Sequence, residues 1–152
     1  MSYKIILDGG GIYKFSSAHF IVGHDKCGRI HGHNFHVAVE ISGPLDEHYF
    51  VLDFMDVKEA IKAEVDKLDH HVLVPRDSKE LALEESKDSI TFSFSGKKYV
   101  VPRDDACLLP LPAVTSELLA KYFHDALSQK FKGYKVKVRI GETSSSFAEY
   151  GG

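Results

Sequence analysis

With 152 residues, 43% of them apolar, the chain is long enough for a sizeable core, and we expect residues 1–152 to form a single domain. The formal charge of −3 arises from 19 basic and 22 acidic side chains spread along the chain, without the basic stripe that a nucleic-acid partner would need. Neither a run of about 18 apolar residues nor a signal-peptide pattern occurs, and only two cysteines are present, so we expect a cytoplasmic protein without a membrane partner or a disulfide framework.

The first predicted elements are strands. Residues 3–7 form a strand that a glycine bend at residues 8–11 interrupts, and residues 12–20 resume the strand and carry His19 near its end. A further strand is predicted for residues 31–41, where every second residue from Phe35 onward is apolar and continues the phase of His31 and His33. We therefore expect one buried face shared by these strands.

Two amphipathic helices are predicted. Asp53 can cap a helix over residues 54–67, because apolar residues recur there at three- and four-residue steps. Thr115 or Ser116 can cap the second helix, which we expect to end at Gly133.

The segment between the helices carries weaker signals. Residues 69–71 fall in the loop that leaves the first helix, and residues 76–87 are charged, with a short helix as one interpretation. Alternation on either side of a Ser-Gly turn predicts a hairpin over residues 90–101. We interpret residues 75–113 as an insertion, most simply a surface elaboration.

The last predicted element is a half-buried strand over residues 135–140, and Glu142 continues the phase of its apolar side chains. The order of these elements indicates an α+β fold, with an antiparallel sheet of four strands, two helices on one face and the inserted hairpin. An unpaired carboxylate on a buried face would be costly, so we expect Glu142 to have a partner, for which a lysine or arginine would be the ordinary choice.

Histidines are concentrated in one segment, with five of the nine between residues 19 and 36. His31 and His33 project from the same face of a strand, and His19 ends a neighbouring strand in a matching phase. Three neutral imidazoles with an open fourth position are the ligand set of a catalytic zinc site. Cys27 could instead close a structural site of four ligands, and the spacing leaves both arrangements open.

Two further groups could carry acid–base chemistry. Cys27 lies close in sequence to the imidazoles, which favours a thiolate base, although a free cysteine is also a common small core residue. Asp69 could fix the tautomer of His70, as in acid–base relays, provided that the loop bends enough for adjacent residues to face each other. The same pair could merely cap the end of the helix.

Five motifs occur in one order along nearly the whole chain: SSAHF at 16–20, Cys27 with HGHNF at 31–35, LDHH at 68–71, TSE at 115–117 and GET at 141–143. In this set the chain resembles the 6-pyruvoyl-tetrahydropterin synthase / 6-carboxy-tetrahydropterin synthase family. The resemblance implies the T-fold, in which sheets of several subunits join into a barrel, and a homohexamer built as a dimer of trimers.

The resemblance also implies roles for the candidate residues. It places Zn²⁺ on His19, His31 and His33. It makes Cys27, Asp69 and His70 a catalytic triad, with the Asp-His part contributed by a neighbouring subunit. It has Glu142 bind the 2-amino and N3-H edge of the pterin, assisted by main-chain groups of Thr115 and Ser116.

The implied activity is a zinc-dependent lyase acting on 7,8-dihydroneopterin triphosphate. Residues 27–31 and the double histidine at 70–71 resemble the members that form 6-carboxy-5,6,7,8-tetrahydropterin and release acetaldehyde and triphosphate, the deazaguanine route. Formation of 6-pyruvoyl-tetrahydropterin is the alternative, because Val114 and the Val74-Pro75 pair depart from the family pattern at the pocket rim. A non-catalytic zinc protein, in which Cys27 and the three histidines close the site, is a further alternative. A zinc hydrolase would need a glutamate base beside the ligands, and this chain has none there. Lys26 and Arg29 are candidates for holding the triphosphate.

Overall fold

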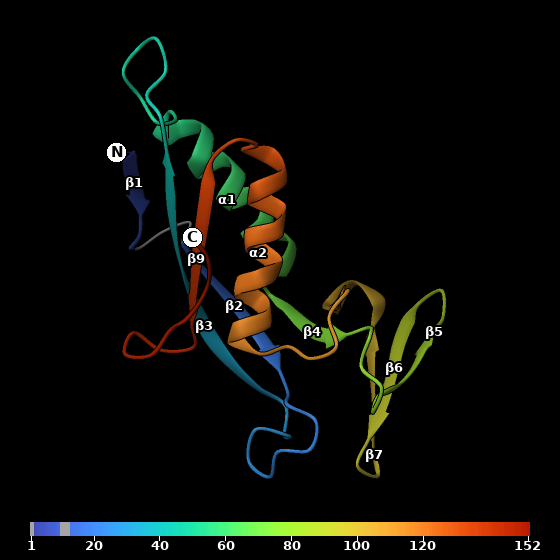
Figure 1. The fold of residues 1–152 in the computed structure, drawn as a ribbon. Helices are drawn as coiled ribbons and strands as arrows, with labels where there is room; N and C mark the ends of the chain where they lie inside the picture. The colour runs from blue at the N-terminus through green and yellow to red at the C-terminus, as the bar shows by residue number, and fades with distance from the viewer. Residues whose placement is uncertain (1, 10–12) are drawn as a thin grey trace. The chain divides into compact units, whose positions relative to one another are not determined.

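The computed structural model describes residues 2–9 and 13–152. In chain order the elements are β1 (Tyr3–Leu7), β2 (Lys14–His19), β3 (His31–Gly43), α1 (Phe54–Leu68), β4 (His71–Pro75), β5 (Ala82–Glu85), β6 (Ser89–Phe94), β7 (Lys97–Pro102), η2 (Arg103–Asp105), β8 (Ala106–Leu109), α2 (Ser116–Lys130), β9 (Lys135–Gly141) and β10 (Ala148–Gly151) (Figure 1). The strands predicted near both ends and the two predicted helices are confirmed. Residues 10–12, which include the second half of the glycine bend predicted at residues 8–11, lie outside the described residues.

The chain groups into two compact units. Unit 1 comprises Met1–Phe15, Asn34–Lys67 and Ser116–Gly152, and unit 2 comprises Ser16–His33 and Leu68–Thr115. Strands β2 and β3 each contribute residues to both units, and the predicted insertion lies within unit 2. The single domain expected for residues 1–152 stays a prediction.

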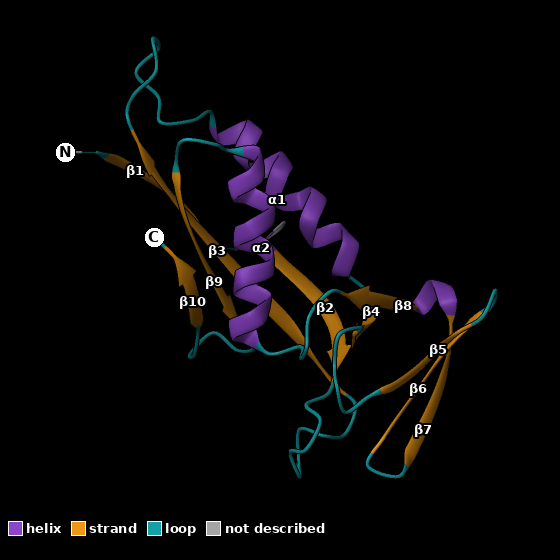
Figure 2. Cartoon of the chain, turned by 45° about the vertical axis from the view of Figure 1, so that its right-hand side comes forward, coloured by secondary structure: helices purple, strands orange, loops and turns teal. Residues whose placement is uncertain are grey.

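Unit 1 is a sheet covered by helices. Strand β3 pairs antiparallel with β1 and with β9, and β9 pairs antiparallel with β10. Figure 2 shows α1 and α2 on the same side of these strands. The side chains that face the helices are fully buried and come from alternate positions of two strands: Phe35, Val37, Val39 and Ile41 of β3, and Val136, Val138 and Ile140 of β9. Period-two patterning therefore predicted this core correctly.

The ends of both helices follow from their sequences. The Asp53 carboxylate accepts a hydrogen bond from the Met55 N–H at 2.8 Å, which is the predicted cap of α1. Helix α2 begins at Ser116, and Gly133 follows its end with φ at 90°, a conformation that glycine adopts without strain. In the described part of the chain neither helix has the length and apolar character needed to cross a bilayer.

Unit 2 contains parallel pairings that the sequence did not predict. Strand β4 pairs parallel with β2, with Ser17 opposite His71, and β8 pairs parallel with β4. His71 therefore begins a strand, and the prediction of a loop through residue 71 is wrong by one residue. With β1, β3, β9 and β10, these three strands make a seven-stranded sheet within the described residues, where the sequence predicted four antiparallel strands. Strands of four or five residues are too short for alternation to distinguish them from loops.

Within the predicted insertion, three strands form a second sheet in the order β5-β6-β7 (Figure 2). The predicted hairpin is confirmed as β6 and β7, joined at Ser95 and Gly96, whose φ angles of 51° and 76° fit a tight hairpin turn. The short helix considered for residues 76–87 is wrong, because β5 occupies Ala82–Glu85. The interpretation as a surface elaboration stays a prediction, and alternate residues of β6 enter a buried cluster of unit 2.

Candidate functional site

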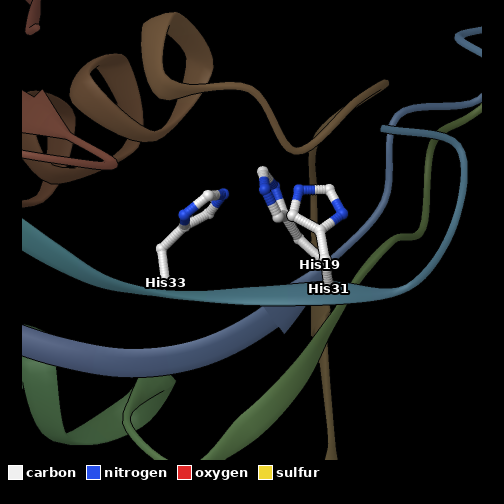
Figure 3. A group of neighbouring side chains, drawn as sticks. All are labelled: His19, His31 and His33. Carbon is white, nitrogen blue, oxygen red and sulfur yellow. The ribbon is translucent and has the colours of Figure 1, made fainter. Parts of the chain in front are cut away.

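Three histidines meet at the ends of two strands in unit 2. His19 is the last residue of β2, and His31 and His33 stand near the start of β3 (Figure 3). One ring nitrogen from each lies within 4.8 Å of the others, and the ring centroids are 4.7, 5.0 and 5.2 Å apart. A Cβ on Gly32 would lie 3.2 Å from the Ser17 carbonyl oxygen, so the glycine between the two ligands lets β3 approach the strand that carries His19.

Backbone carbonyls orient two of these rings. Nδ1 of His19 donates to the Val114 carbonyl at 2.8 Å, and Nδ1 of His31 donates to the Arg29 carbonyl at 2.7 Å. Since a carbonyl only accepts, each neutral ring carries its proton on Nδ1 and its lone pair on Nε2. Metal-binding histidines are held in the same way, with the second ring nitrogen bonded to a carbonyl or carboxylate. The local structure therefore prepares the Nε2 atoms of His19 and His31 as ligands.

The donor set suits a transition metal. His19 is fully buried, and His31 and His33 are half-buried, so the three nitrogens stand at the edge of the protein interior. Imidazole nitrogen binds zinc, copper, iron and nickel. Within the described residues Cys27 is not part of this group, which favours three protein ligands with an open fourth position.

Cys27 lies on a tight loop between β2 and β3. Its carbonyl accepts from the Ile21 N–H at 2.7 Å, and its own N–H donates to Nδ1 of His24 at 3.0 Å. The Gly28 N–H bonds the His24 carbonyl at 2.8 Å, and a Cβ there would lie 2.3 Å from that carbonyl oxygen, so only glycine fits. The thiol is half-buried, which is compatible both with access to a substrate and with packing.

Asp69 and His70 do face each other, as a relay requires. His70 has φ at 62°, which bends the chain so that its Nδ1 lies 2.9 Å from Oδ2 of Asp69. Oδ1 of Asp69 accepts from the Ser16 N–H at 2.8 Å. That hydrogen bond is the main cause that lowers the pKa of Asp69, with a smaller contribution from His70. The His70 side chain is 81% exposed.

Two of the three predicted substrate-binding residues line a small hollow of unit 1. Glu142 directly follows β9 and is half-buried, and Ser116 is the first residue of α2. Both line the same hollow of about 160 Å³, whose other lining residues are Glu117, Ser146, Phe147 and Ala148. The structure thus brings Glu142 and Ser116 together, and Thr115 immediately precedes Ser116 in the chain.

The chain matches a known protein family. The family model for 6-pyruvoyl tetrahydropterin synthase matches residues 12–152. The chain belongs to this family. It is accordingly an enzyme, a pterin synthase of the lyase type, and the family resemblance predicted from the five motifs is confirmed.

Relatives and solved structures agree with this membership. A protein of Methanocaldococcus jannaschii, provisionally named a 6-carboxy-5,6,7,8-tetrahydropterin synthase, is 37% identical over 120 residues, which cover 78% of this chain and 74% of the relative. The 6-carboxy-5,6,7,8-tetrahydropterin synthase of Aquifex aeolicus is 31% identical over 135 residues, covering 83% and 76%. The crystal structure of 6-pyruvoyl tetrahydropterin synthase from Plasmodium vivax has a TM-score of 0.90 at 23% identity and covers 100% of this chain and 98% of that one. This likeness confirms the T-fold of the pterin synthase family.

Sequence reasoning missed the backbone groups that support the site. The carbonyls of Val114 and Arg29 orient two of the candidate ligand histidines, and both backbone groups of Ser16 hold the Asp69-His70 turn. A main-chain group leaves no signature in residue type, so no sequence pattern could have identified these contacts. Val114 departs from the family pattern, yet the carbonyl that it contributes is independent of its side chain.

Proposed function

We propose that this pterin synthase converts 7,8-dihydroneopterin triphosphate and water into 6-carboxy-5,6,7,8-tetrahydropterin, acetaldehyde and triphosphate, with zinc as its metal. The observation that carries the proposal is the group of three imidazole nitrogens within 4.8 Å of one another. The names of the M. jannaschii and A. aeolicus relatives support the 6-carboxy product over the 6-pyruvoyl product.

His19, His31 and His33 would hold the zinc. Bound there, a zinc ion would polarise a hydroxyl or carbonyl of the substrate side chain and make the loss of a neighbouring proton less costly. The hydrogen bonds from Nδ1 of His19 and His31 to backbone carbonyls support this role, because they fix ring orientation and raise ligand basicity.

Cys27 would act as the base that removes the side-chain proton. Its loop follows β2, which ends at the ligand His19, and precedes β3, which begins at the ligand His31, so one short segment links the base to two ligands. Its absence from the group of metal-binding atoms supports a role as base over a role as fourth ligand. Lys26 and Arg29 are exposed on the same loop, which suits contacts with the triphosphate.

Asp69 and His70 would move protons to and from the reacting side chain. The Asp69 carboxylate, itself fixed by the Ser16 N–H, accepts from Nδ1 of His70 and leaves Nε2 of that ring to exchange a proton. The strong exposure of His70 supports its action at the site of a neighbouring subunit, within the homohexamer that the family resemblance implies.

Glu142 would bind the pterin edge, because two carboxylate oxygens suit two adjacent N–H donors. Main-chain groups of Thr115 and Ser116 would assist. The hollow beside Glu142 has about 160 Å³, whereas pockets for ligands of drug size have roughly 300–1,000 Å³. This difference supports a pocket that is completed by a second copy of the chain.

The deciding experiment is to incubate zinc-loaded protein with 7,8-dihydroneopterin triphosphate and to identify the products by mass spectrometry. We expect a 6-carboxy pterin together with acetaldehyde in equal amount. A pterin that retains its three-carbon side chain, with no acetaldehyde, would reassign the activity to 6-pyruvoyl formation. Zinc-loaded protein that yields neither product would refute both assignments.

A further inference from the structure

We infer that the inserted sheet β5–β7 holds the loop of residues 20–30 in place and that Phe92 and Phe94 are positioning residues for Cys27. The inference rests on the proposed role of Cys27 as the base. The inserted residues are far from the histidines in sequence, and none of them belongs to the candidate site. Their influence would be transmitted through a buried aromatic cluster.

The insertion and the site loop share a hydrophobic core in unit 2. Ile90, Phe92 and Phe94, at alternate positions of β6, are buried against Phe20 and Val74. The Phe20 ring is stacked on Phe92 with centroids 5.1 Å apart and on Phe94 with centroids 4.6 Å apart, at interplanar angles of 7° and 8°. Near-parallel stacking on two rings fixes both the position and the tilt of Phe20.

Both ends of the site loop are anchored in this cluster. Phe20 is bonded directly to the ligand His19, and Ile30, which packs against the same cluster, is bonded directly to the ligand His31. Val22 makes a further contact near the start of the loop. The cluster that β6 helps to form therefore contacts the loop both where the loop leaves one candidate ligand and where it reaches the next.

Cys27 depends on this anchorage. Within the loop, the residue after Phe20 donates its N–H to the Cys27 carbonyl at 2.7 Å, and His24 accepts from the Cys27 N–H. A movement of Phe20 would carry Ile21 with it and shift the thiol relative to the three histidines. Displacements of about 1 Å at a catalytic group can lower turnover about 10²-fold. The ring of Phe92, which is fully buried, is thus suited to limit such movement.

The test compares Phe92→Leu with Phe123→Leu. Both phenylalanines are fully buried and stacked on another ring, but Phe123 lies on α2 in unit 1, against Phe15. Val100→Ala, at a position of β7 that is 60% exposed, controls for any change in the inserted sheet. Phe92→Ala is a stronger version, and Phe92→Leu decides the matter if the alanine variant does not fold.

Hydrogen exchange and alkylation are measured first, on metal-free protein. In Phe92→Leu we expect exchange in residues 20–30 and iodoacetamide labelling of Cys27, read by peptide mapping, to rise about tenfold through more frequent local opening. Zinc-loaded Phe92→Leu should lose about tenfold to 10²-fold in kcat, with KM within about twofold of the original value. Phe123→Leu and Val100→Ala should show none of these local changes.

Unchanged exchange and labelling in Phe92→Leu would overturn the inference, even if the original enzyme turns over normally. Equal effects in Phe123→Leu would also overturn it, because they would reflect general destabilisation. Failure of the original zinc-loaded protein to turn over would refute the proposed function and leave the exchange result as a separate finding on the loop.

Discussion

The three-histidine group and the Glu142 hollow differ in how completely one chain builds them. The rings of His19 and His31 are oriented by carbonyls of the same chain, and the three candidate ligand atoms already lie within 4.8 Å of one another. The hollow that contains Glu142 is only about 160 Å³ in volume. One chain thus brings all three candidate metal ligands together, whereas the hollow beside Glu142 is small for the substrate pocket proposed there.

This difference separates two kinds of expected effect. A group whose partners all lie in one chain should behave in an all-or-none way when a ligand is lost. When a pocket is built from several chains, the loss of one carboxylate should weaken substrate binding only by the contacts which that carboxylate makes. The variants below test these expectations, beginning with the largest.

Removing one ligand histidine should abolish the metal centre. We expect His31→Ala and His33→Ala to lose stoichiometric zinc and all detectable turnover, because two imidazoles do not hold the ion. The fold should survive, since a core of this size does not need a metal. Zinc content by mass spectrometry of the metal, together with circular dichroism, checks both points. Full zinc occupancy in the two variants would refute the prediction that His31 and His33 bind the metal.

Cys27→Ala tests whether the metal centre ends at three ligands. Zinc content should stay at one per chain, while kcat falls by about 10²–10⁴-fold, the usual contribution of a positioned base. Metal analysis and steady-state kinetics on the same preparation give the answer. Loss of zinc along with activity would instead favour the closed site of four ligands.

Glu142→Gln probes the less complete region. The amide keeps the volume but replaces one acceptor by a donor, so pterin affinity should fall by about 1.5–3 kcal/mol, the range for hydrogen bonds to charged groups. Glu117→Gln is the matched control, because Glu117 lines the same hollow and carries no predicted role. Calorimetry measures both variants. Equal losses in the two would show that only the charge of the hollow matters.

The smallest effect concerns acid stability. The pKa of Asp69 is lowered in the folded protein, so its contribution to stability is present above the ordinary aspartate value of about 4 and is lost as the pH falls through the folded value. Because the carboxylate is 36% exposed, we expect about 0.2–1 kcal/mol at most. Chemical unfolding of the original protein and of Asp69→Asn across this pH range should show that difference shrinking in acid. A constant difference would contradict the assignment.

Sequence patterns predicted much of unit 1 and the outline of the metal site. Alternation placed His19, His31 and His33 on neighbouring strands, and helical periodicity with the Asp53 cap located α1. These signals are local, because they arise from the geometry of one element at a time. The short strands β4, β8 and β10 were not predicted, because four or five residues are too few to show a clear alternation.

The sequence by itself determined which side chains can hold a metal and which strand face they share. Residue types can be read directly from the sequence, and side chains alternate between the two faces of a strand with a period of two. Only the tertiary structure decided what supports them. The Val114 carbonyl contacts His19, 95 residues away in the chain, and the rings of Phe92 and Phe94 on β6 stack on Phe20. Such contacts join segments far apart in the chain through main-chain groups and packing, and neither leaves a local pattern that a sequence can display.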